Sequence, residues 1–170
     1  MDFYELAQKR YSCRKFSDKP VEQEKIDKII EVANLAPTAV NNQPFVIWNM
    51  KSDAAKEAIR QSTKCHFGAN TFLVVGASKD LGWDREYDNH NFAEVDASIV
   101  ATHMMLEIKE LGLDTTWVGW FDAPKLQELM PKMKGYELIA VFPIGYAAED
   151  AKPSIRHDER KRIKDIVVEL

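Results

Sequence analysis

The chain has 170 residues, of which 45% are hydrophobic and 29% charged, and its formal net charge is -4. This composition suits one folded domain with its own core and excludes a disordered or collagen-like chain. The acidic balance argues against a general nucleic-acid binder, whose affinity depends on neutralising phosphates. Cys13 and Cys65 are the only cysteines, too few for a disulfide scaffold or a thiolate zinc site.

The opening residues lack the basic and apolar regions of a signal peptide, and no apolar run approaches the roughly 18 residues of a membrane span. We therefore expect a soluble, cytoplasmic protein with no membrane or nucleic-acid partner. The four histidines show no metal-ligand spacing, so we expect no metal site. No repeat, low-complexity segment or linker is visible, and residues 1–170 are predicted to form a single domain.

Hydrophobic periodicity predicts an alternation of helices and strands. In chain order the pattern gives a helix over 2–9, a helix over 21–36 that Pro37 stops, a strand over 45–48, a helix from 52 or 53 to 60, a strand over 71–77, a helix over 92–111, a strand over 115–120, a helix over 124–130 and a strand over 138–144. The strand over 71–77 is apolar on both faces, so we expect it to be central in the sheet. The polar and aromatic segment 83–91 is predicted to be a variable loop at the rim of a site.

The predicted helix over 92–111 is the longest, and its apolar residues cover more than one stripe. We therefore expect it to be covered on two sides, by layers of one subunit or by a subunit interface. Asn91 and Glu94 form a capping-box-like pair at its start, and Gly112 is predicted to end it.

The tail over 147–170 has no apolar core of its own before the segment 163–168. That last segment has the pattern of a strand that needs an open sheet edge. Packing across a partner subunit would satisfy both parts of the tail.

Three short polar stretches suggest a bound phosphorylated ring cofactor. Arg10-Tyr11-Ser12-Cys13-Arg14 lies near the start, Pro37-Thr38-Ala39-Val40-Asn41-Asn42-Gln43-Pro44 follows, and Arg160-Lys161-Arg162 lies near the end. A planar guanidinium can hold a phosphate through two parallel hydrogen bonds. The alternative for Arg10 and Arg14 is surface ion pairing with acids such as Asp18, and for Arg160 it is a solvated charge run.

Asn41, Gln43 and Gly119 also have two interpretations each. The amides of Asn41 and Gln43 suit the donors and acceptors along the edge of a polar ring, but the two residues could also simply form a turn, since Asn and Pro favour turns. Gly119 either serves strand packing or lets a flat ligand approach the backbone.

At these positions the chain resembles the FMN-dependent nitroreductase family. Arg10–Arg14 resembles the opening Arg-x-Ser-x-Arg motif of that family, and 37–45 is similar to its Pro-Ser-x-x-Asn-x-Gln-Pro-Trp turn. Residues 96–113 resemble its central helix, 117–119 its flavin-side strand, and 145–146 with 160–161 its closing segment. Thr38 stands in place of the usual serine and Phe45 in place of the usual tryptophan, and the proline that commonly follows Gly145-Tyr146 is absent.

The resemblance implies an α+β fold: a three-layer α-β-α sandwich with a mixed, mostly antiparallel sheet and a C-terminal strand exchanged in a homodimer, the tail 147–170 packing on the partner. It implies FMN at the subunit interface and NADH or NADPH as electron donor, with nitroaromatic, quinone or related conjugated acceptors. Dehalogenation, enone reduction and noncatalytic flavin binding are the alternatives. No catalytic side chain is expected, because the cofactor carries the chemistry. The cofactor-binding residues implied are Arg10, Tyr11, Ser12, Arg14, Pro37, Thr38, Ala39, Asn41, Gln43, Val118, Gly119 and Arg160.

Overall fold

Short helices begin where the sequence supplies a side-chain cap. In the computed structural model, which describes residues 2–170, Asp2 accepts a hydrogen bond from the Glu5 N–H at the start of α1 (Phe3–Lys9). Ser52 caps α3 (Asp53–Ser62) and Asp122 caps α5 (Ala123–Leu129) in the same way. Each cap satisfies a backbone N–H that has no partner within its helix.

The two long helices end where the sequence predicts. α2 (Gln23–Asn34) stops just before Pro37. α4 (Ala93–Glu110) is followed by Gly112 in the left-handed region, at a φ of 72°. The start of α4 differs in detail from the expected capping box: the Asn91 Oδ1 accepts from the Ala93 N–H at 3.1 Å, and Phe92 is the cap.

The main sheet has four antiparallel strands in the order β1 (Phe45–Asn49), β2 (Thr71–Ala77), β6 (Glu137–Gly145) and β5 (Asp114–Thr115). β2 lies between β1 and β6 and is buried, so its predicted central place is confirmed. Two further strands, β3 (Asp84–Arg85) and β4 (His90–Asn91), turn the expected rim segment into a small hairpin. Short 3-10 turns cover Ala39–Asn41, Lys79–Leu81, Pro131–Met133 and Ile163–Asp165.

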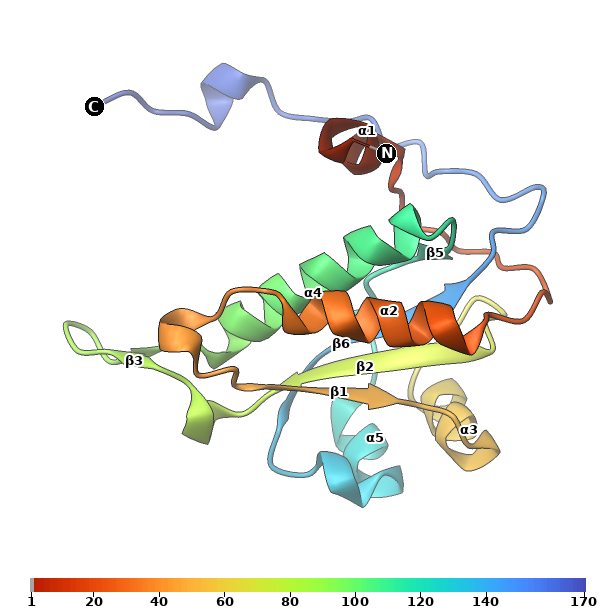
Figure 1. Cartoon of the computed structure of the whole chain (residues 1–170), viewed down its shortest axis with the longest axis horizontal. Coiled ribbons are helices and arrows are strands. Elements are labelled where there is room, and N and C mark those ends of the chain that lie inside the picture. Colours follow the sequence, from red (N-terminus) through yellow and green to blue (C-terminus); the bar gives the residue numbers. More distant parts are fainter. Residues whose placement is uncertain (1) are drawn as a thin grey trace.

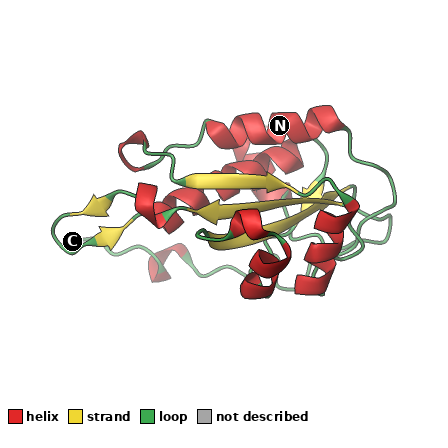
Figure 2. Cartoon of the chain, turned by 90° about the horizontal axis from the view of Figure 1, so that it is seen from below, coloured by secondary structure: helices red, strands yellow, loops and turns green. Residues whose placement is uncertain are grey.

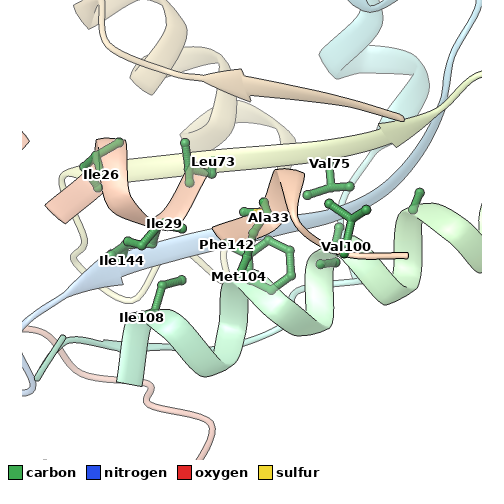
Figure 3. Packing of buried hydrophobic residues seen from close by; sticks show 14 of the residues in the cluster. Ile26, Ile29, Ala33, Leu73, Val75, Val100, Met104, Ile108, Phe142 and Ile144 are labelled. Atoms are coloured by element: carbon green, nitrogen blue, oxygen red, sulfur yellow. The ribbon is translucent and has the colours of Figure 1, made fainter. Parts of the chain in front are cut away.

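The sheet separates two cores, which makes the fold a three-layer sandwich (Figure 1, Figure 2). Alternation along β2 sends Leu73 and Val75 toward α2 and α4, and Phe72 and Val74 toward α3 and α5. Figure 3 shows the first core, where side chains from α2, α4, β2 and β6 meet. The expected α+β sandwich with a mostly antiparallel sheet is confirmed; the exchange of a strand between subunits stays a prediction.

The strand expected over 115–120 is much shorter. β5 pairs Thr115 with Ile144, and the same register resumes only as an isolated bridge from Val118 to Val141. That register places Thr116 opposite Pro143, which has no N–H to donate to the ladder. The predicted length of this strand was wrong, because the residues 115–120 alone do not show that Pro143 of β6 lies opposite them.

One face of α4 packs on the sheet while the other stays open in its first half. Val95 is 40% exposed, and it lines a groove together with Ser98, Ile99 and Thr102. The two-sided cover expected for this helix is therefore incomplete within one chain. The tail leaves the body past α1 and reaches outward (Figure 1), and Ile163 and Val168 are exposed. In place of the strand expected over 163–168, Ile163–Asp165 forms a 3-10 turn, and the residues up to 168 pair with no strand among residues 2–170.

No helix among residues 2–170 has both the length and the apolar character needed to cross a membrane.

Candidate functional site

The basic segment Arg10–Arg14 lies along the free edge of β5. Ser12 forms a parallel bridge with Thr115, and the Cys13 N–H donates to the Thr115 carbonyl at 3.0 Å. Cys13 is fully buried, so alternation places Ser12 and Arg14 on the outward face. The sheet edge therefore fixes the backbone while the Arg14 side chain stays exposed.

Arg10 and Arg160, from opposite ends of the chain, lie near one another. The pKa of Arg10 is lowered from its ordinary value, first by burial and then by the positive charge of Arg160. The Arg160 Nη1 donates to the carbonyls of His157 and Glu159, which fixes its side chain to the tail backbone. Two mutually repelling guanidiniums form a site that an anion would stabilise.

No carboxylate within residues 2–170 forms an ion pair with Arg10, Arg14 or Arg160. The ion-pair alternative for these arginines, including pairing with Asp18, therefore finds no support. Arg162 differs, because its guanidinium pairs with Asp165 at 2.8 Å. Of the two tail arginines in the basic run, Arg160 is the one without a carboxylate partner among residues 2–170.

Tyr11 joins the tail to the long helix. Its ring lies edge-on to His157 with centroids 6.3 Å apart, and the Lys109 Nζ lies 5.4 Å from its centroid. Burial and a hydrogen bond with Cys13 raise the pKa of Tyr11. These contacts give Tyr11 a part in placing Arg160 beside Arg10.

The turn over 37–44 has an unusual backbone. Val40, Asn41 and Gln43 all lie in the left-handed region, with φ of 46°, 58° and 52°. The Thr38 Oγ1 accepts from the Gln43 N–H at 3.1 Å, and the Gln43 Nε2 donates to the Asn41 Oδ1 at 3.3 Å. Left-handed non-glycine residues cost about 1–3 kcal/mol each and cluster at functional sites.

Asp96 anchors this turn from α4, and the sequence reasoning missed it. Its side chain is 2% exposed, and its Oδ1 accepts from the Ala39 N–H at 2.9 Å. Its Oδ2 is buried with no hydrogen-bond partner among the described residues. Asp96 lies on the buried stripe of α4, four residues before Val100 and eight before Met104. An acid on an otherwise apolar stripe is the sequence signal that could have identified Asp96 as a functional residue.

The basic segment and the turn lie at opposite ends of α4 (Figure 1). Asp96 holds the turn near the start of the helix, whereas Lys109, near its end, contacts Tyr11 and pairs with Asp114. At 1.5 Å per residue, these anchor points are roughly 20 Å apart along the axis. A single chain therefore does not bring the two groups of predicted residues together.

Val118 packs in the core on the α3–α5 side of the sheet, and Gly119 follows it in the chain. Val118 is buried and exchanges two backbone hydrogen bonds with Val141, each 3.0 Å long. Gly119 is exposed, and a Cβ added there would meet no atom within 4 Å. Internal packing therefore does not require glycine at this position, and the approach of a flat ligand to Gly119 stays a prediction.

Comparison with known proteins places this arrangement in a family. A family model described as the nitroreductase family matches residues 7–71 and 65–146. A nitroreductase family protein from Clostridium difficile 630 is 34% identical, with a TM-score of 0.91 over 99% of this chain and 98% of that one.

Two further proteins are similar to this chain. A putative nitroreductase from Exiguobacterium sibiricum, solved in complex with FMN, shares the fold at a TM-score of 0.84 and 21% identity, over 100% of this chain and 98% of that one. Iodotyrosine deiodinase 1 of Rattus norvegicus is 26% identical over 198 aligned residues, covering 98% of this chain and 69% of the rat protein. The family match and the similarity to the Clostridium structure span most of the chain, which belongs to the nitroreductase family.

Proposed function

We propose that this protein is an FMN-dependent NAD(P)H oxidoreductase, active as a homodimer with FMN bound between subunits. The observation that carries the proposal is the pair of unneutralised arginines, Arg10 and Arg160, beside one end of a helix whose other end holds a strained polar turn. FMN has both a phosphate and a flat polar ring, and it matches these two features.

The residues present fit the phosphate end of FMN. Arg10 and Arg160 would bind the phosphate, because an anion would offset both the burial and the repulsion from Arg160 that lower the pKa of Arg10. Ser12 and Arg14, on the outward face of the edge segment, would bind the ribityl chain and neighbouring polar atoms. Val118 and Gly119 would lie along the ring, where Gly119 leaves open space.

The other half of the site would come from the second subunit. Pro37, Thr38 and Ala39 would shape the approach, and the amides of Asn41 and Gln43 would hydrogen-bond the polar edge of the ring. The open groove along Val95 and Ile99, together with the exposed tail, provides surface for the partner subunit. A cytoplasmic location stays a prediction.

FMN held by these residues would supply the redox chemistry between NADH or NADPH and a nitroaromatic, quinone or related conjugated acceptor. The chain's own task is to bind, orient and tune. Arg14, exposed beside Ser12, would place positive charge where the reduced ring becomes anionic. No side chain is assigned as an acid or nucleophile, since the reaction needs none from the protein.

The test is an absorbance spectrum of the purified protein under anaerobic conditions, before and after NADH or NADPH, with mass analysis of the released cofactor. We expect a flavin spectrum that bleaches with a nicotinamide, release of FMN, and steady turnover once an acceptor is added. Protein that stays colourless after reconstitution with FMN would contradict the proposal. Flavin that binds and never bleaches would identify a flavin store or sensor.

Reductive dehalogenation is the second candidate, and the similarity to iodotyrosine deiodinase 1 favours it. Turnover of iodotyrosine by the dithionite-reduced, FMN-loaded protein, followed by iodide release, tests this reaction. Iodide release faster than the reduction of any nitroaromatic or quinone would place the protein among dehalogenases.

A further inference from the structure

A cleft of about 530 Å³ lies between the end of α3 and the start of α5. Its size falls within the range of small-molecule sites. The lining combines three cations with an aromatic wall and one acid. The cations are Arg60, Lys64 and Lys125, the wall is Trp120 and Phe121, and the acid is Asp122.

The cleft carries more positive than negative charge, although the whole chain is acidic. None of the three cations forms an ion pair with a carboxylate within the described part of the chain. Arg60 donates to the Asn70 Oδ1 at 2.9 Å, and the one acid, Asp122, uses its Oδ1 to cap α5. Lys64 and Lys125 are exposed and free to meet an anion.

Hydrogen bonds fix the backbone of the aromatic wall, whereas the Trp120 side chain is exposed. The buried Thr63 donates its hydroxyl to the Trp120 carbonyl at 2.7 Å, and the Asp122 N–H donates to the carbonyl of the buried Ser62 at 2.8 Å. Trp120 nevertheless remains 81% exposed. An exposed tryptophan on a fixed backbone offers a large apolar face at low conformational cost.

The cleft adjoins the proposed flavin face, because Trp120 directly follows Gly119. We infer that it receives the electron acceptor, and that the acceptor is a planar aromatic compound with an anionic group such as a carboxylate. The ring would pack on Trp120, and Lys64 and Lys125 would attract the anion. This inference rests on the proposed function and adds the substrate class to it.

The test compares two acceptors of similar size, 4-nitrobenzoate and the neutral 4-nitrobenzyl alcohol, with FMN-loaded protein. We expect the wild type to prefer the anion in kcat/KM. In Lys64→Gln/Lys125→Gln the anion-to-neutral ratio should fall about tenfold, since each exposed charge contributes a few-fold. The matched control Lys132→Gln/Lys134→Gln removes two exposed lysines elsewhere and should keep the wild-type ratio.

An equal preference in the wild type, or the same ratio in both double variants, would overturn the inference. If no acceptor is reduced at all, the proposed function fails, and equilibrium dialysis of 4-nitrobenzoate against FMN-loaded protein then decides the binding question alone. Binding that weakens in Lys64→Gln/Lys125→Gln and persists in the control supports the anion site, and absence of binding overturns it.

Discussion

The basic segment Arg10–Arg14 and the turn over 37–44 are built in opposite ways. The basic segment has ordinary backbone held by the sheet edge, and its proposed function lies in side-chain charge that no carboxylate among residues 2–170 neutralises. The turn carries no charge, and its proposed function lies in a backbone that one buried carboxylate, Asp96, holds in a strained form. One region would bind by electrostatics and the other by shape, which is how a charged tail and a flat ring are recognised together.

The largest effect should come from removing the charge. Arg10→Ala/Arg160→Ala should fold normally but bind FMN more than about a hundredfold more weakly, because charge-assisted hydrogen bonds contribute roughly 1.5–3 kcal/mol each. A fluorescence titration with FMN measures the affinity. The control is Arg162→Ala, since Arg162 is already paired with Asp165. Equal losses in the double variant and the control would show that no particular arginine binds the phosphate.

Release of the turn should have an intermediate effect. Asp96→Ala removes the acceptor for the Ala39 N–H, so the turn samples other conformations and FMN affinity should fall about tenfold. Asp96→Asn keeps an acceptor oxygen and should recover most of that loss. Asp53→Ala, at an exposed acid at the start of α3 on the other side of the sheet, is the control in the same titration. If the Asn variant binds as weakly as the Ala variant, Asp96 does not act by holding the turn.

The smallest effect should come from relieving strain. Val40→Gly fits the φ of 46° without a Cβ penalty, so the free energy of unfolding of the flavin-free protein should rise by about 1 kcal/mol after the entropy cost of glycine. Urea unfolding measures this free energy. The control is Val21→Gly, which should lower it because Val21 packs on the core. A loss of stability in Val40→Gly similar to that in Val21→Gly would mean that the turn stores no strain.

The sequence predicted those parts of the fold that depend on local signals. Pro37 and Gly112 marked helix ends, and the apolar run over 71–77 marked the central strand. The strand over 115–120 was predicted too long, because the length of β5 depends on Pro143, which lies opposite it in the sheet and is distant in sequence.

The candidate site divides in the same way. The arginines could be identified because their charge and spacing are visible in the sequence. The role of Asp96 could not, because it depends on contact between helix α4 and a residue 57 positions away in the turn. The left-handed Val40 was not predictable either, because a β-branched residue ordinarily avoids that region. The cleft beside Trp120 requires α3 and α5 to pack together, which local sequence does not show.

The most direct test of a site shared between subunits is complementation. Arg10→Ala/Arg160→Ala and Asn41→Ala/Gln43→Ala are co-expressed with different tags, and the mixed dimer is isolated through both tags. In the mixed dimer one site receives every defect and the other receives none, so about one of its two sites should bind FMN with wild-type affinity. FMN binding no better than in either parent variant would place each site within a single chain and contradict the account.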